Sequence, residues 1–254
     1  MRNGVGKKQN GFSLVELMVA LLLGSIITAA AAELFVVNRQ TENLQQGVAL
    51  IQDQGRFIFD YVSRDLMQAG LGTSGAVDPF IFAGHNGIVG SDGNRYDVLV
   101  TQVNGGVGCD DQATFSGIKR YHVDSNKHLI CAEYKFDGST WTAGNSEALI
   151  DNVEAFQVLY GLDYNKFGEA GYGQANLYTN AAGAVAAGKR IVSVRFGVLL
   201  SSDHVVSLDT SLAPSSISLL DQTIDSSDGV TLNDGRLFRV YSSTVALRNQ
   251  MDPQ

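Results

Sequence analysis

An apolar segment near the N-terminus limits the possible folds of this chain more than any other feature. Residues 12–32 contain a single charged side chain, Glu16, and the next charge along the chain is Glu33. A helix over these 21 residues would be about 31 Å long and could cross the hydrocarbon core of a membrane. The sequence therefore predicts a transmembrane helix, preceded by a short basic segment, Met1–Gly11.

Glu16 lies inside this apolar segment, where an acidic side chain costs about 2.5–3.5 kcal/mol on insertion scales and indicates a functional role. A secretory signal is cut after its apolar stretch. Here a cut between Gly11 and Phe12 would precede that stretch and leave the helix on the mature chain. Glu16 would then lie one helical turn from the new amine of Phe12, and the two groups could pair between staggered subunits of a fibre. The alternative is a glutamate that reaches the interface at the helix end and has no role.

The run Gly11-Phe-Ser-Leu-Val-Glu16 resembles the class III signal of type IV pilins and type II secretion pseudopilins. The resemblance implies that a prepilin peptidase cuts after Gly11 and methylates the amine of Phe12. It also implies that Glu16 governs subunit addition, that membrane lipid surrounds the helix before assembly, and that an inner-membrane assembly platform is a partner.

The charge of the mature chain argues against a nucleic-acid partner. Removing the three basic residues of Met1–Gly11 from the total of 18 leaves 15, against 26 acidic residues, a net side-chain charge of −11. Phosphate contacts need a basic surface. The basic leader favours its own retention in the cytoplasm and export of everything after the helix. We expect a single-pass inner-membrane protein with a periplasmic C-terminal domain, which is later incorporated into a pilus at the cell surface.

The two cysteines fit an oxidising periplasm. Cys109 and Cys131 are 22 positions apart, and we expect them to form a disulfide. The alternative is a zinc site that recruits His128 together with Asp110 or His122. Such a site would have one irregular cluster of ligands and lacks the spacing of known zinc motifs.

The predicted helix continues beyond the membrane as an amphipathic helix. Its stripe steps by three and four residues through Leu34, Val37, Thr41, Leu44, Val48, Ile51, Gly55, Ile58 and Val62. With no proline before Pro79, we expect one helix from about Phe12 to Ala69 whose second half packs on the C-terminal domain. A dimeric coiled coil is the alternative, and the polar or small residues in the stripe weaken it.

The rest of the chain indicates strands joined by loops. The predicted strands are Tyr96–Val103, Ile118–Val123, His128–Phe136, Val153–Tyr160, Ile191–Leu200 and Leu237–Leu247. Asp163–Lys189 and Ser201–Gly235 are expected to be long loops without structure of their own. The predicted fold is α+β, with a long N-terminal helix packed on an antiparallel β-sheet domain. We divide the chain into a leader (1–11), a transmembrane or fibre-core helix (12–32), an amphipathic helix (33–70) and a β-rich domain (71–254).

Further segments resemble the PilW-type minor pilins, a group related to type II secretion pseudopilin J. They are Gln54–Phe57, Asp65–Gly70, Asp151–Gly161, Asp163, Arg236–Tyr241 and Thr244–Asn249. This resemblance implies that other minor pilins and the major pilin are partners.

No catalytic constellation is visible in the sequence, which predicts a protein that is not an enzyme and needs no cofactor. Gly105–Gly108 lacks the lysine and serine of a phosphate loop. No nucleophile stands at a recognisable spacing from the four histidines, His85, His122, His128 and His204. Two acidic clusters are weak calcium candidates against a default of solvated turns, namely Asp163, Asn165 and Glu169, and Asp221, Asp225 and Asp228.

Three functions remain open from the sequence. The first is a minor pilin that helps to initiate or cap assembly of a type IV pilus through packing of its N-terminal helix and the Glu16–amine pair. The second is a pseudopilin of a secretion system. The third is a tip subunit for adhesion or binding whose long loops contact a surface, a receptor or DNA. A membrane-anchored enzyme is remote because catalytic groups are missing.

Overall fold

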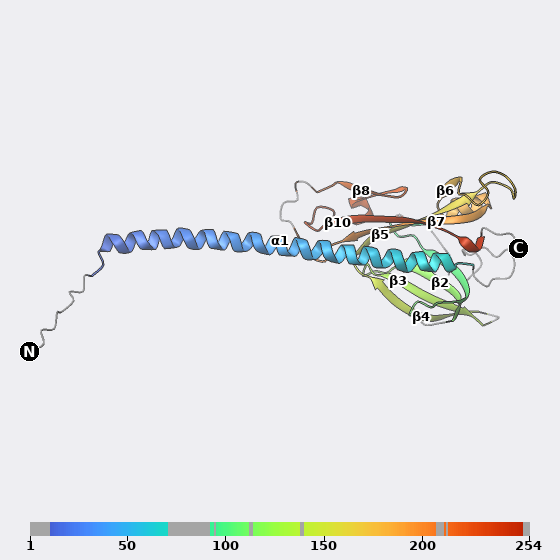
Figure 1. Ribbon diagram of the computed structural model, residues 1–254, viewed down its shortest axis with the longest axis horizontal. Helices are drawn as coiled ribbons and strands as arrows, with labels where there is room; N and C mark the ends of the chain where they lie inside the picture. Colours follow the sequence, from blue (N-terminus) through green and yellow to red (C-terminus); the bar gives the residue numbers. More distant parts are fainter. Residues whose placement is uncertain are drawn as a thin grey trace, which may run out of the picture.

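The computed structural model describes residues 11–70, 92–93, 95–111, 114–137, 140–206, 211 and 213–250. The rest of the predicted leader, Pro79 and His85 lie outside these residues. Within them the chain forms one very long helix followed by ten strands and short helical segments. Figure 1 shows the helix projecting far beyond the β-domain that its C-terminal part joins.

Helix α1 runs without a break from Leu14 to Gln68, which confirms the prediction of one continuous helix. Ser13 caps its N-terminus, and the Ser13 side-chain oxygen accepts the backbone N–H of Glu16 at 3.2 Å. At the other end the N–H of Ala69 bonds to the carbonyl of Leu66, and Gly70 follows with a φ of 78°. A glycine in the left-handed region is a common helix terminator.

The buried stripe of α1 begins later than predicted. Ile51 is the first fully buried position, and Gly55, Ile58 and Val62 continue the stripe beneath the domain. The earlier stripe positions Leu34, Val37, Thr41 and Leu44 are exposed. The expectation that the whole second half of the helix packs on the domain is therefore wrong. The reason is length: α1 extends about 82 Å, whereas the longest strand of the domain, with 12 residues, extends only about 40 Å.

Two antiparallel sheets and a hairpin form the domain. The first sheet has the order β1(Leu99–Gly106), β2(Phe115–Val123), β3(Leu129–Phe136), β4(Trp141–Ile150). The second has the order β10(Phe238–Ala246), β7(Arg190–Ser201), β5(Val153–Asp163), β6(Leu177–Thr179). The hairpin is β8(Ser216–Leu219) and β9(Gln222–Asp225). The predicted α+β class is confirmed, but the single sheet of the prediction is in fact two.

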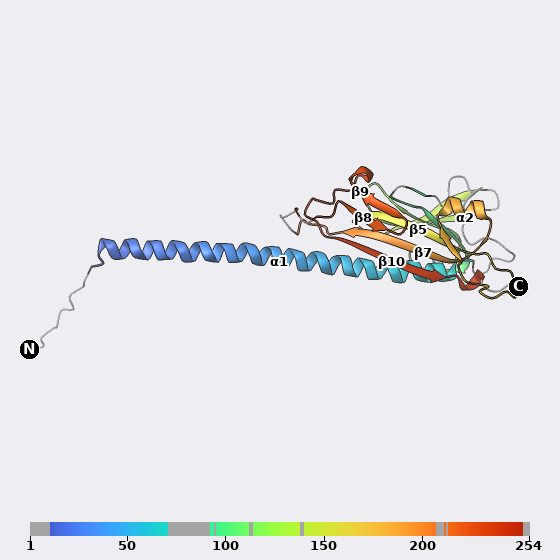
Figure 2. The same ribbon diagram turned by 90° about the horizontal axis from the view of Figure 1, so that it is seen from above.

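The helix is covered from both sides. In Figure 1 the first sheet lies below the C-terminal part of α1 and the second sheet above it, and Figure 2 shows α1 running alongside β10. The core unites α1 with both sheets: Ile58 and Leu66 of the helix belong to one buried cluster with Tyr121 of β2 and Phe196 of β7. Packing on sheets, rather than a coiled coil, therefore buries this part of α1.

Both segments predicted as unstructured loops have structure, so that expectation is wrong. The first contains β6 and the short helix α2(Ala181–Ala187); the second contains β8, β9 and the 3-10 turn η1(Ser226–Asp228). The sequence also gave no sign of β4, whose side chains are nearly all exposed. An exposed edge strand has no buried face, and therefore no apolar alternation by which to recognise it. Gly188 ends α2 in the left-handed region with a φ of 54°.

Candidate functional site: the exposed N-terminal helix and its anchor

The first part of α1, Leu14–Ala32, forms an apolar surface that nothing in the described chain covers. Phe12 is 88% exposed, and every position from Leu14 to Gln46 is exposed. Among the described residues, α1 is the one helix long and apolar enough to cross a membrane. A soluble protein rarely exposes so large an apolar surface, so this segment must lie in lipid or against other subunits.

Glu16 is the one acidic side chain on the first half of this surface. It lies in the first turn of α1, where the positive end of the helix dipole favours a negative charge. Among the described residues its carboxylate has neither a hydrogen bond nor an ion pair, and Phe12 lies one turn before it. The geometry leaves the Glu16 carboxylate free for a group supplied from outside the chain.

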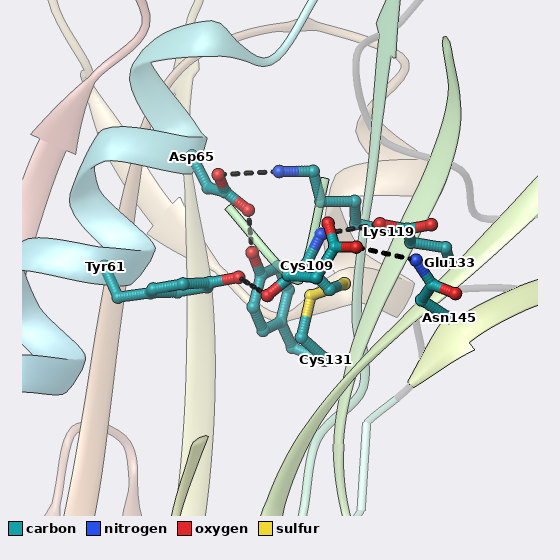
Figure 3. Close-up of a disulfide and its surroundings, with 9 residues drawn as sticks. Tyr61, Asp65, Cys109, Lys119, Cys131, Glu133 and Asn145 are labelled. Carbon is teal, nitrogen blue, oxygen red and sulfur yellow. Dashed lines mark hydrogen bonds and ion pairs between the residues drawn. A yellow bond between two sulfur atoms is a disulfide. The ribbon is translucent and has the colours of Figure 1, made fainter. Parts of the chain in front are cut away.

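The C-terminal end of α1 is anchored beside the disulfide. Cys109 and Cys131 are bonded, with their Cα atoms 5.8 Å apart, as expected from the sequence. The Tyr61 hydroxyl donates to the carbonyl oxygen of Cys109 at 2.7 Å, and the Cys109 N–H donates to Oε1 of Glu133 at 2.6 Å. Figure 3 shows the Tyr61 side chain reaching from the helix to this loop.

A buried ion pair lies next to this anchor. Nζ of Lys119 on β2 is 2.7 Å from Oδ1 of Asp65 on α1, and the two side chains are 2% and 8% exposed. The hydroxyl of Tyr121, which is fully buried, donates to the other oxygen of Asp65. Burial raises the pKa of the Asp65 carboxyl group, while Lys119 acts in the opposite direction.

Sequence reasoning missed this cluster, although a signal was present. Asp65 stands three positions after Val62 on the buried stripe of the helix, where a carboxylate requires a partner. Lys119 and Tyr121 are two positions apart on one strand and therefore point to the same face. What the sequence could not supply was which strand lies against which turn of the helix.

The structure also shows what the side chains considered as metal ligands bond to instead. Both cysteines are in the disulfide, so a zinc site that uses them as thiolate ligands is wrong. Asp163 accepts the N–H groups of Asn165 and Gly173 and pairs with Arg190 at 2.5 Å. Among the described residues, no group of three or more His, Cys, Asp or Glu side chains is placed to hold a metal ion.

The remaining candidates have structural partners or lie at the surface. The Asp225 and Asp228 side chains form a reciprocal capping box around η1, and Asp221 is exposed. Glu169 accepts the N–H of Lys166 at 2.8 Å. The described histidines neighbour carboxylates or are partly buried: His128 lies 3.1 Å from Asp124, His204 lies 2.9 Å from Asp203, and burial lowers the pKa of His122.

A projecting apolar helix with a methylation motif at its start, anchored to a β-domain, defines a type IV pilin-like protein. Residues 6–32 match the prokaryotic N-terminal methylation motif. The chain belongs to the type IV pilus-assembly protein W family, whose sequence model matches residues 118–249, just over half of its length.

One solved structure similar to this chain is a type IV-like pilin from Thermus thermophilus. The two share 16% sequence identity with a TM-score of 0.46, over 80% of this chain and 99% of the other. No curated protein matches the chain at a significant level.

Proposed function

We propose that this protein is a minor pilin that helps to initiate or cap assembly of a type IV pilus. The observation that carries the proposal is the exposed apolar helix from Phe12 onward, with the Glu16 carboxylate unpaired in the described chain. Membership of the pilus-assembly protein W family supports the same role. Its partners are other minor pilins, the major pilin and the inner-membrane assembly platform.

Maturation comes first in this proposal. A prepilin peptidase cuts after Gly11 and methylates the amine of Phe12, which leaves α1 in the inner membrane and the β-domain in the periplasm. A Cβ atom added at Gly11 would meet no atom within 4 Å. The fold therefore does not require this glycine, and a processing defect in Gly11→Val would report the peptidase alone.

Assembly then transfers α1 from lipid to the fibre. Both environments are dry, so little hydrophobic free energy changes on transfer, and the polar groups select orientation and axial stagger. The Phe12 amine of one subunit pairs with Glu16 of a neighbour, and the attraction between them is strengthened in a medium of low dielectric constant. Head-to-tail contacts of this kind use different patches on the two subunits and can extend a filament without closing.

The decisive experiment replaces Glu16 with valine in the full-length protein. Glu16→Val is expected to insert, to form the Cys109–Cys131 disulfide, and to lose cross-linking to its pilin partners together with most surface pili. Glu33→Val is the matched control, because Glu33 is also an exposed acid on α1 but lies beyond the apolar segment. Mass spectrometry should find methylated Phe12 at the N-terminus of the wild-type protein and of both variants.

Two outcomes would contradict the proposal. One is wild-type partner capture and piliation in Glu16→Val. The other is an intact leader, Met1–Gly11, on protein from functional filaments. A strong but incomplete loss of pili would favour a capping subunit, which has fewer neighbours to pair with than a subunit inside the shaft.

A further inference from the structure

In the buried Lys119–Asp65 pair, the ammonium group makes fewer hydrogen bonds than it has donors. An ammonium group has three N–H donors. Across the residues that the structure describes, the Lys119 ammonium is hydrogen-bonded to a single acceptor, Oδ1 of Asp65. An unpaired donor in the interior is unfavourable, and more so when the group is charged. An ion pair therefore stabilises this part of the interior less than well-packed apolar side chains of similar volume would.

The surroundings of the pair are shielded from solvent. Lys119 lies on β2, an inner strand, opposite Thr101 of β1 and Glu133 of β3, and both neighbours are buried. Helix α1 covers this face and supplies Asp65. Burial disfavours the charged form of a carboxyl group and favours its uptake of a proton. The raised pKa of Asp65 agrees with that direction.

We propose that Lys119 and Asp65 condense to an intramolecular isopeptide bond, which joins α1 covalently to β2. The geometry places a nucleophilic nitrogen, a carboxyl group and a polarising hydroxyl together: Nζ is 2.7 Å from Oδ1, and the Tyr121 hydroxyl donates to Oδ2. The inference goes beyond the proposed function and does not depend on it.

The atoms of this reaction balance without an added reagent. A proton passes from the ammonium to Oδ1, and the lone pair of Nζ then attacks Cγ of Asp65 to form the C–N bond. Negative charge develops on Oδ2, where the Tyr121 hydroxyl stabilises it. A second proton moves from nitrogen to Oδ1, the Cγ–Oδ1 bond breaks, and water leaves. Two charged groups are replaced by one amide, whose single N–H replaces three donors.

A second lysine–carboxylate pair provides a comparison in the same chain. Lys127 bonds both oxygens of Glu154 at 2.8 Å, but the Lys127 side chain is 35% exposed. Glu154 also pairs with Arg236 at 2.9 Å, so its charge is fully compensated. Water reaches this ammonium, and two cations share the carboxylate. We therefore expect no condensation at Lys127.

Mass spectrometry of the full-length protein, extracted from membranes, reduced and denatured, tests the proposal. The measured mass of the wild-type protein should be lower, by the mass of one water molecule, than the mass calculated from its processed sequence. Trypsin should fail to cut after Lys119, and a branched peptide should join the segment beginning at Asp65 to the one containing Lys119. Lys119→Arg should show no loss of water, because a guanidinium is not a nucleophile. Tyr121→Phe should lower the bonded fraction, and Lys127→Arg should retain the bond.

The wild-type measurement decides the question even if a variant fails to fold. A wild-type mass equal to that of the processed sequence, with normal tryptic cleavage after Lys119, would overturn the proposal and leave a buried ion pair. Loss of water that persists in Lys119→Arg would overturn it too, because the modification would then lie elsewhere. Neither measurement requires pili, so failure here is distinct from failure of the assembly role.

Discussion

The Tyr61 hydroxyl lies 2.7 Å from the carbonyl oxygen of Cys109 and donates a hydrogen bond to it. This contact spans 48 positions and connects helix α1 to the loop that the disulfide closes. Burial raises the pKa of the Tyr61 phenol, so the group remains a donor throughout the physiological range. The disulfide therefore does more than restrict the conformations of the unfolded chain. It also holds in place the Cys109 carbonyl oxygen, which accepts the hydrogen bond from the helix.

Removal of the disulfide should weaken both the domain and the hold on the helix. Replacing Cys109 and Cys131 with alanine is expected to lower the free energy of unfolding by about 3 kcal/mol, the chain-entropy value for a loop of this size. Tyr61→Phe should cost about 1 kcal/mol in the oxidised protein. Chemical denaturation of the full chain in detergent measures both quantities.

The coupling between these two changes is the sharper test. In the variant without cysteines the loop that carries residue 109 is no longer held, so Tyr61→Phe should cost less than it does in the oxidised protein. A double-mutant cycle gives the difference directly. Equal costs in both backgrounds would show that the loop keeps its position without the bond.

Gly55 of α1 lies against the ring of Tyr241 on β10. A Cβ atom at this position would lie 2.7 Å from Cζ of Tyr241, closer than side chains tolerate. Gly55→Ala should therefore destabilise the domain by about 1–3 kcal/mol, the usual cost of overpacking, less the gain of up to about 1 kcal/mol in helix propensity. Thermal unfolding followed by circular dichroism measures the net change.

Two matched variants test the cause of the Gly55 effect. Gly24→Ala lies on the exposed part of the same helix, where a Cβ would meet nothing within 4 Å, and should leave domain stability unchanged. In a Tyr241→Ala background the clash is absent, so adding Gly55→Ala should cost nothing further. Destabilisation that persists without the Tyr241 ring would contradict the steric explanation.

Asp97 should make the stability of the domain depend on pH. The residue is 4% exposed, and its carboxylate accepts the N–H groups of Gly93 and Val158. Burial raises the pKa of Asp97 to about 7. Between about pH 4 and pH 7 the folded state keeps a proton that the unfolded state releases. The free energy of unfolding should therefore fall as pH rises through this interval, by at most about 1.4 kcal/mol per unit, and level off above it.

Denaturation curves at several pH values test the role of Asp97. Asp97→Asn lowers stability overall, because it leaves one backbone N–H without an acceptor, but it should abolish the part of the slope that belongs to this group. Asp53→Asn, at an exposed position on α1, should leave the slope as it is in the wild type. An unchanged slope in Asp97→Asn would assign the pH dependence to other carboxyl groups.

Local patterns in the sequence were sufficient for the parts of this protein that depend on neighbouring residues. The apolar run after Phe12, the single acid at Glu16 and the absence of proline determine a continuous helix and its polar exception. Six strands were recognisable because each alternates or concentrates its apolar residues, and most of them bury at least one face; β10 buries only Val245. The cysteine pair was readable because an exported chain with two cysteines has one possible internal bond.

Tertiary structure decided everything that depends on which elements meet. The stripe from Leu34 to Leu44 has the same period as the stripe from Ile51 onward, yet only the second is buried, because the domain covers less than half of the helix. The division into two sheets could not be predicted from the sequence, because strands that pair with each other can lie far apart in the chain. The Asp65–Lys119 pair joins residues 54 positions apart. Periodicity identifies the buried face of an element, whereas only packing determines what that face contacts.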